Sequence, residues 1–262
     1  MNEALEVIVL GIVQGATEFI PVSSSGHLIL IGELLGFGAS SFALDAILNF
    51  GTLSALVVYF HKRLIRILKD LLKGNVKLLM QLIIATIPAV LVGYLIQDFI
   101  AANLRSSFLV ASMLIIVGVI MVFLHKLSVP APKSIQDLRY SGALKVGFFQ
   151  VLAFIPGTSR SASTIIGGRL LGLSNRSAAE FSFLLAIPVF SGALLKLSID
   201  GTFSEINLAP EMILLGVLSS FISGLVAIRF MLSFLSKHGL KSFGTYRILV
   251  GGLLLLWLVI NP

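Results

Sequence analysis

The chain has 262 residues, of which 57% are hydrophobic and only 12% are charged, and its formal net charge is +7. This composition excludes a soluble globular domain and is typical of polytopic membrane proteins. The chain contains no cysteine, which excludes disulfides, thiolate nucleophiles and cysteine-based metal sites. Its basic residues cluster between hydrophobic runs, so we attribute the positive charge to membrane orientation and expect no nucleic-acid binding.

The first residues, MNEALEVIVLG, carry Glu3 and Glu6 instead of a basic segment, and we expect them to remain in the mature protein. The segment Gly11–Gly32, GIVQGATEFIPVSSSGHLILIG, then joins two apolar arms of about 15 and 13 residues through a break rich in proline and serine. Each arm is too short to cross a hydrocarbon core of about 30 Å at 1.5 Å per residue. We therefore predict a re-entrant helical hairpin whose break lines a protein cavity.

Three longer apolar segments follow, at about 41–61, 79–97 and 106–125. Residues 62–77, between the first two, alternate basic and apolar side chains and predict an amphipathic helix that lies on anionic lipid. The loop 126–145 is also basic. Because cytoplasmic loops carry an excess of lysine and arginine, we place both basic segments in the cytoplasm.

The second half repeats the first. Gly147–Gly168, GFFQVLAFIPGTSRSASTIIGG, shares with the first hairpin segment a G-x-x-Q, an F-I-P and a run of hydroxyl residues. Three apolar segments follow again, at about 177–197, 210–236 and 243–260. Three spans after a hairpin end on the opposite side, so the second half must be inverted, and we place both chain ends outside.

The predicted fold is therefore an all-α integral membrane protein with an inverted-topology repeat. Each half is a re-entrant helical hairpin plus three transmembrane helices. One membrane domain covers residues 1–262, with the first repeat at about 1–126 and the second at about 141–262. Loops near 98–105 and 198–211 carry little positive charge, as expected of the outer side.

Ionisable residues inside the hairpins are the candidates for function. Glu18 and His27 lie in the first hairpin and Arg160 in the second. A charged side chain in a membrane segment costs about 2.5–3.5 kcal/mol on insertion scales, so it predicts a functional site. An inverted repeat brings its two breaks together near the midplane of the membrane. We expect an acid, an imidazole and a guanidinium to share one cavity there.

Spacing suggests a role for each group of the first hairpin. Gln14 and Glu18 are four residues apart, so their side-chain oxygens can converge on one cation. The start of the second arm, which offers free N–H groups and a helix dipole to an anion, holds Ser23, Ser24, Ser25 and Gly26. His27 follows Ser24 by three residues, which predicts a pair of nucleophile and base.

The second break offers an equivalent helix start, formed by Gly157, Thr158, Ser159 and Ser161. Arg160 adds a planar donor fork that suits phosphate oxygens. When Pro156 is aligned with Pro21, Arg160 falls opposite Ser25. Arg247, early in the last span, could reach an anion or extend to the membrane interface, and both interpretations stay open. Together these groups favour phosphate-ester or anhydride chemistry.

Two stretches, QGATEFIPVSSSGH and PGTSRS, resemble the signature motifs of the undecaprenyl-pyrophosphate phosphatase family of the bacitracin-resistance type. The resemblance covers essentially the whole chain, including EFSFLLAIP and Tyr246–Arg247. It implies removal of the terminal phosphate from undecaprenyl pyrophosphate, which gives the monophosphate lipid carrier for cell-wall synthesis. It also implies a divalent cation (Mg²⁺ or Ca²⁺) and a bacterial inner (plasma) membrane location, with the active site open to the periplasmic side.

Residue by residue, the resemblance makes Glu18, Ser24, His27 and Arg160 the catalytic positions. The chain departs from the family pattern at Gln14, where many members have glutamate. An amide is a weaker ligand for a cation than a carboxylate, so this departure affects the expected metal site. The resemblance leaves open whether the serine or the histidine attacks phosphorus, and the spacing favours Ser24. The expected partners are a polyprenyl pyrophosphate lipid and membrane lipids, and a homodimer is compatible with the sequence.

Two alternative assignments also fit parts of the sequence. The acid-phosphatase superfamily shares S-G-H and S-R motifs but requires a histidine six residues after the arginine, where this chain has Ile166. A transporter or flippase for polyprenyl phosphates fits the inverted repeat. A carrier needs an anion site but no attacking group, so the pairing of Ser24 with His27 favours an enzyme.

Overall fold

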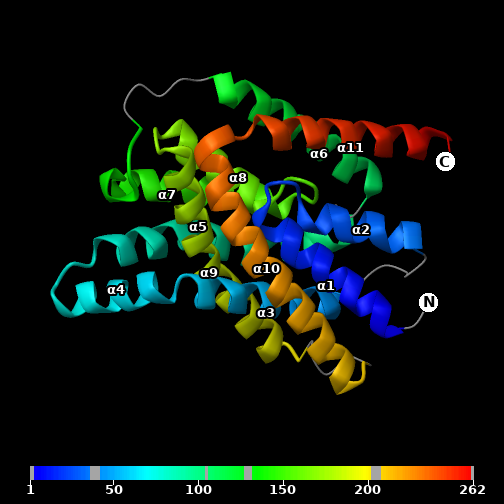
Figure 1. Ribbon diagram of the computed structural model, residues 1–262, viewed down its shortest axis with the longest axis horizontal. Coiled ribbons are helices and arrows are strands. Elements are labelled where there is room, and N and C mark those ends of the chain that lie inside the picture. The colour runs from blue at the N-terminus through cyan, green and yellow to red at the C-terminus, as the bar shows by residue number, and fades with distance from the viewer. Residues whose placement is uncertain (1–2, 36–41, 104–105, 127–131, 202–207, 261–262) are drawn as a thin grey trace.

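A computed structural model describes residues 3–35, 42–103, 106–126, 132–201 and 208–260 (Figure 1). Over these ranges the regular secondary structure is helical, apart from one isolated bridge between Lys133 and Leu173, and turns or loops join the helices. In the described part of the chain, five helices are long and apolar enough to cross a membrane, or six if a bent helix pair counts as one span. The predicted all-α integral membrane fold is confirmed.

The first predicted hairpin consists of α1 (Glu3–Phe19) and α2 (Ser24–Leu35), with the break between them. At 1.5 Å per residue α1 is about 26 Å long and α2 about 18 Å, so neither arm spans a core of about 30 Å unless the bilayer becomes thinner there. Pro21 and Ser23 interrupt the helix, because proline lacks an N–H and the Ser23 hydroxyl bonds to the nearby backbone of Gly26.

The three predicted segments that follow are helices. α3 (Phe42–Tyr59) meets α4 (His61–Leu72) at a bend of 67°, and α5 (Lys77–Asn103) and α6 (Ser107–Lys126) complete the first half. α4 is the predicted amphipathic helix, since its basic residues alternate with exposed apolar ones. The loop residues 104–105 and 202–207 lie outside the described part of the chain.

The second half repeats the order of a hairpin followed by three long helices; it adds two short 3-10 helices and has no described counterpart of α4. A short 3-10 helix, η1 (Ile135–Asp137), precedes the second hairpin, which consists of α7 (Tyr140–Val151), η2 (Leu152–Phe154) and α8 (Arg160–Leu170). The three long helices are α9 (Asn175–Ile199), α10 (Pro210–His238) and α11 (Lys241–Ile260). Element order and break positions therefore match the predicted repeat, whereas inversion of the second half relative to the first stays a prediction.

Each hairpin packs against a helix of the other half. α1 lies along α10, α7 lies along α5, and α6 pairs with α11 (Figure 1). Glycines permit the close approach: a Cβ on Gly11 would lie 2.8 Å from the carbonyl oxygen of Gly216, and one on Gly147 would lie 2.5 Å from that of Ala85. Small residues at helix contacts are the usual device for packing inside membranes. This crossed packing brings the two breaks together.

Candidate active site

Both breaks end in a serine with an unusual backbone. Ser23 and Ser159 each have φ of 77°, a region that non-glycine residues rarely adopt except where the surrounding structure holds them. The Ser23 hydroxyl accepts the N–H of Gly26 at 3.4 Å, and the Ser159 hydroxyl accepts that of Ala162 at 3.2 Å. Each serine thus caps the second helix of its hairpin. The same strained cap in both copies indicates that the breaks are built alike.

The caps correct the alignment of the two copies. Between proline and cap the second break has one residue more than the first, because Pro156 precedes Ser159 by three positions and Pro21 precedes Ser23 by two. Matching the prolines therefore shifts the helices that follow by one residue. In the structure Arg160 corresponds to Ser24, not to Ser25. The serine and the arginine are thus the first helical residues after equivalent caps.

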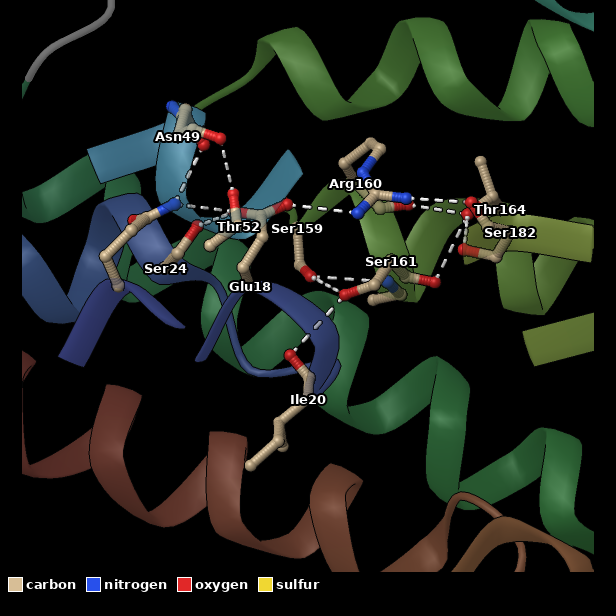
Figure 2. Close-up of polar contacts among 12 residues, drawn as sticks. Glu18, Ile20, Ser24, Asn49, Thr52, Ser159, Arg160, Ser161, Thr164 and Ser182 are labelled. Atoms are coloured by element: carbon tan, nitrogen blue, oxygen red, sulfur yellow. Dashed lines mark hydrogen bonds and ion pairs between the residues drawn. The ribbon is translucent and has the colours of Figure 1, made fainter. Parts of the chain in front are cut away.

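An ion pair between Glu18 and Arg160 joins the two breaks. A terminal nitrogen of Arg160 lies 3.1 Å from Glu18 Oε1, and the two side chains are only 9% and 8% exposed (Figure 2). The other terminal nitrogen donates to the carbonyl of Ser182 at 2.9 Å. The guanidinium also lies 5.0 Å from the ring centroid of Phe190. Residues 142 positions apart therefore share one buried charge centre.

The second oxygen of the Glu18 carboxylate is also used. It accepts the Ser24 hydroxyl at 2.7 Å and the Gln14 amide nitrogen at 3.1 Å. That amide nitrogen also donates to Asn49 Oδ1 at 2.9 Å. Figure 2 shows Ser24 and Asn49 on the same side of the carboxylate. Gln14 and Glu18 do lie side by side as predicted, but the amide presents nitrogen to the carboxylate, not oxygen.

This cluster is where a divalent cation would have to bind. No group of three or more histidines, cysteines or carboxylates suited to a metal occurs among the described residues. The oxygen atoms that could serve come from one carboxylate, Glu18, from the hydroxyl of Ser24 and from the side chains of Gln14 and Asn49. Magnesium is commonly held by one or two carboxylates and completed by substrate phosphates. A cation here would require the Gln14 amide to turn its oxygen inward, since in the structure the amide nitrogen faces both Glu18 Oε2 and Asn49 Oδ1.

His27 is held by two contacts that involve neither Ser24 nor Glu18. Its Nδ1 lies 2.8 Å from the carbonyl oxygen of Ser23, and its Nε2 lies 2.8 Å from the Tyr246 hydroxyl. A carbonyl only accepts, so Nδ1 carries the hydrogen and neutral Nε2 accepts from Tyr246. The two rings are stacked with centroids 5.8 Å apart.

The expected hydrogen bond between Ser24 and His27 is therefore absent from this part of the chain. The bond to the carbonyl of the residue four positions earlier, Ser23, turns the imidazole toward Tyr246 on α11. Ser24, at the first position of α2, points the other way, toward Glu18 on α1. Spacing of three residues placed the two side chains near each other, but their hydrogen-bond partners lie on different helices.

Arg247 is fully buried at 0% exposed, and all three of its nitrogens donate to backbone carbonyls. Nε and one terminal nitrogen bind Leu114 and Met113 of α6 at 3.4 and 3.3 Å. The terminal nitrogens also reach Pro21 at 3.1 Å, Gly157 at 2.6 Å and Thr158 at 3.1 Å. This placement corrects both interpretations of Arg247, since it neither faces an open anion site nor extends to the interface. It ties the two breaks to each other.

The remaining predicted contact residues differ in exposure. Ser25 is exposed and its hydroxyl lies 3.4 Å from that of Ser23, whereas Ser161 is buried and donates to the carbonyl of Ile20 at 3.4 Å. Thr158 is also buried, and its hydroxyl has no partner in the described structure.

Two glycines of the breaks fit against one residue of α6. A Cβ on Gly26 would lie 3.2 Å from a Val110 side-chain carbon. Gly157 has φ of 87°, and a Cβ there would lie 2.6 Å from the Val110 carbonyl oxygen. A side chain at Gly157 is therefore excluded by both conformation and space.

Four residues of the site were not predicted: Asn49 and Ser182 bind the charge centre, Phe190 lies over Arg160, and Tyr246 binds His27. A polar residue in an apolar span was the available signal for Asn49. Tyr246 was visible only as part of a family motif. Nothing in the local sequence assigned either residue a partner.

Comparison with known proteins agrees with the geometry. The family model described as bacitracin resistance protein BacA matches residues 7–253. A protein of Parvibaculum lavamentivorans named undecaprenyl-diphosphatase is 40% identical over 258 residues, which cover 97% of this chain and 96% of that protein. A protein of the same name from Porphyromonas gingivalis strain W83 is 40% identical over 268 residues, with 96% and 95% covered.

Proposed function

This chain belongs to the family of the bacitracin resistance protein BacA, and on that premise we propose how its two breaks act on undecaprenyl pyrophosphate. The chain is a membrane phosphatase that removes the terminal phosphate of this lipid and leaves undecaprenyl phosphate. The observation that carries the mechanism is the buried charge centre, in which Glu18 binds both Arg160 and Ser24. A transporter or flippase is not favoured, since the relatives are named for a hydrolase.

Arg160 is proposed to bind the terminal phosphate. Its guanidinium presents planar donors, of which one faces Glu18 and one faces the Ser182 carbonyl, and its Nε has no partner in the described structure. Such a fork matches phosphate oxygens better than a point charge does. Donors aimed at oxygens whose negative charge grows in the transition state typically contribute about 100- to 1,000-fold in turnover.

Ser24 is proposed as the nucleophile, with Glu18 taking its proton. The hydroxyl already donates to Glu18 Oε2 at 2.7 Å. Attack of Ser24 Oγ on the terminal phosphorus breaks the bond to the bridging oxygen and releases undecaprenyl phosphate. The hydroxyl proton passes to Glu18, and the serine is left as its phosphate ester. This assignment replaces His27 by Glu18 as the base of the first step.

His27 is proposed to act in the second step. Its Nδ1 is fixed by the Ser23 carbonyl, so Nε2 offers a lone pair on the side of Tyr246. Nε2 can take a proton from water as the water oxygen attacks the phosphorus of the phosphoserine. The bond between that phosphorus and Ser24 Oγ breaks, Oγ regains its proton from Glu18, and inorganic phosphate leaves. The contact with the Ser23 carbonyl keeps the ring in the required tautomer.

A divalent cation, Mg²⁺ or Ca²⁺, is part of the proposal and would be held by Glu18 and Gln14 with Asn49 nearby. When bound, it would neutralise charge on the phosphate oxygens. The residues of the chain perform the attack and the proton transfers described above. We also propose that the site opens to the periplasmic side of the bacterial inner membrane, an orientation supported by the basic segment 62–77 on the other side.

The test is phosphate release followed by trapping of the intermediate. Purified protein in detergent, given prenyl pyrophosphate labelled in the terminal phosphate and Mg²⁺, is expected to release phosphate. Acid quenching of the first turnover should leave acid-stable label on Ser24, which peptide mapping would locate. Label that is lost in acid but survives a parallel alkaline quench on His27 would instead make the histidine the nucleophile. Exchange of lipid across vesicles without phosphate release would refute the phosphatase.

A further inference from the structure

A polar cavity lies between α4, the start of α5 and η1, away from both hairpin breaks. It has a volume of about 100 Å³, whereas one water molecule needs roughly 15 Å³. Its polar lining comes from Arg63, Arg66, Asp70, Asn75, Lys77, Gln81 and Gln136. None of these residues belongs to the proposed reaction. The cavity is therefore a separate feature that the phosphatase activity leaves unexplained.

Positive charge dominates this cavity. Three cationic side chains face one carboxylate, that of Asp70. Arg63 is partly offset by Glu180, 3.5 Å away, and Lys77 donates to the Gln136 carbonyl at 2.6 Å. Arg66 is exposed, and its guanidinium has neither a hydrogen bond nor an ion pair among the described residues. A free guanidinium beside a lysine is an arrangement that binds phosphate.

A buried acceptor sets a second condition on the occupant. Gln81 is 1% exposed, and its amide nitrogen donates to the Leu138 carbonyl at 2.6 Å. Its Oε1 is buried in the described structure without a partner. Turning the amide over would bring two oxygens together, so the orientation is fixed. Because a buried acceptor without a donor is destabilising, the occupant should carry a hydroxyl or other donor as well as an anion.

The outer face of α4 indicates where this occupant comes from. Ile65, Leu68 and Leu72 are 49%, 60% and 87% exposed and recur on one face of the helix at the spacing of a membrane-facing stripe. A basic helix with such a stripe lies in the interface between headgroups and acyl chains. The cavity borders this helix, so it opens at the depth where lipid phosphates sit. This position favours a lipid headgroup over a soluble anion.

We propose that this cavity binds the headgroup of an anionic glycerophospholipid. Its phosphate would accept from Arg66 and Lys77, and a headgroup hydroxyl, as in phosphatidylglycerol, would donate to Gln81 Oε1. The site is independent of the phosphatase mechanism, because no residue is shared between the two.

Native mass spectrometry of the full chain, titrated in detergent with defined lipids, tests the proposal. Phosphatidylglycerol should bind with one tight site, phosphatidylcholine should bind more weakly, and glycerol phosphate and inorganic phosphate should not compete at matched concentrations. Arg66→Gln should weaken the binding of phosphatidylglycerol by about tenfold, as expected for loss of a charge-assisted hydrogen bond. Gln81→Met should weaken the binding of phosphatidylglycerol but not that of phosphatidic acid, which lacks the headgroup hydroxyls.

Lys69→Gln is the matched control, since Lys69 is exposed on the same helix but does not line the cavity. It should change the affinity less than twofold. If the Arg66 and Lys69 variants lose the same affinity for phosphatidylglycerol, diffuse surface charge explains the binding, and the proposed site is wrong. Equal binding of free phosphate would overturn the lipid assignment. Should Gln81→Met fail to fold, the comparison of the Arg66 and Lys69 variants decides.

Discussion

Replacing Arg160 by methionine separates the catalytic role of the buried charge centre from its structural role. In the wild type a guanidinium nitrogen of Arg160 lies 3.1 Å from the Glu18 carboxylate, which is only 8% exposed. The substitution removes this guanidinium and leaves the buried carboxylate without its ion-pair partner. Removing one partner of a buried ion pair typically destabilises a protein by about 3–5 kcal/mol. For a chain of this size that corresponds to a fall of roughly 10 °C in the unfolding midpoint. Turnover should fall by about 100- to 1,000-fold, because the phosphate loses its donor fork.

The double variant Arg160→Met with Glu18→Gln distinguishes the two losses. Removing both charges deletes the unpaired carboxylate, so most of the lost stability should return. Activity should not return, since the double variant lacks both the guanidinium that donates hydrogen bonds to the phosphate and the carboxylate that accepts the serine proton. Arg160→Lys should keep most of the stability yet rescue turnover poorly, because an ammonium cannot reproduce the planar fork.

Arg169→Met is the matched control on the same helix. Arg169 is a partly exposed arginine of α8 that donates to the Leu173 carbonyl at 2.8 Å and lies outside the charge centre. Its loss should leave phosphate release near that of the wild type. The assays are phosphate release in detergent and thermal unfolding of the same samples. Recovery of turnover to within about tenfold in the double variant would refute the catalytic role of Arg160.

Three further predictions follow from the geometry. Tyr246→Phe should lower kcat by up to about tenfold with little change in KM, since one hydrogen bond to His27 is lost and the ring stacking is kept. An unchanged kcat with an unchanged pH–rate profile would show that the hydroxyl does not position His27. Arg247→Met should lower both the unfolding midpoint and kcat, because carbonyls of both breaks lose their donor; a folded variant with normal turnover would contradict the tie between the breaks. Single cysteines introduced at Glu3 and Glu211 should react with an impermeant reagent from outside, and those introduced at Asn75 and Lys133 should be protected. If the cysteines at positions 3 and 75 are labelled from the same side, the first hairpin spans the membrane.

Local sequence was sufficient for the helices and their breaks. The length of each apolar run determined which helices could span the membrane, and Pro21 and Pro156 followed by hydroxyl residues marked both hairpin breaks. These features depend on residues close in the chain, because helix formation and its interruption are set by neighbouring backbone groups. The meeting of Glu18 with Arg160 was also inferred from the sequence, since the repeat relates the two breaks.

Only the tertiary structure decided which side chains form hydrogen bonds. The caps at Ser23 and Ser159 shifted the match between the copies by one residue, Ser24 paired with Glu18 in place of His27, and Arg247 bound carbonyls up to 226 positions away. Sequence spacing fixes which side chains share a helix face, but the direction of each side chain and its partner depend on the helix packed against that face. In this chain those partners come from the other half of the repeat, and no local pattern specifies them.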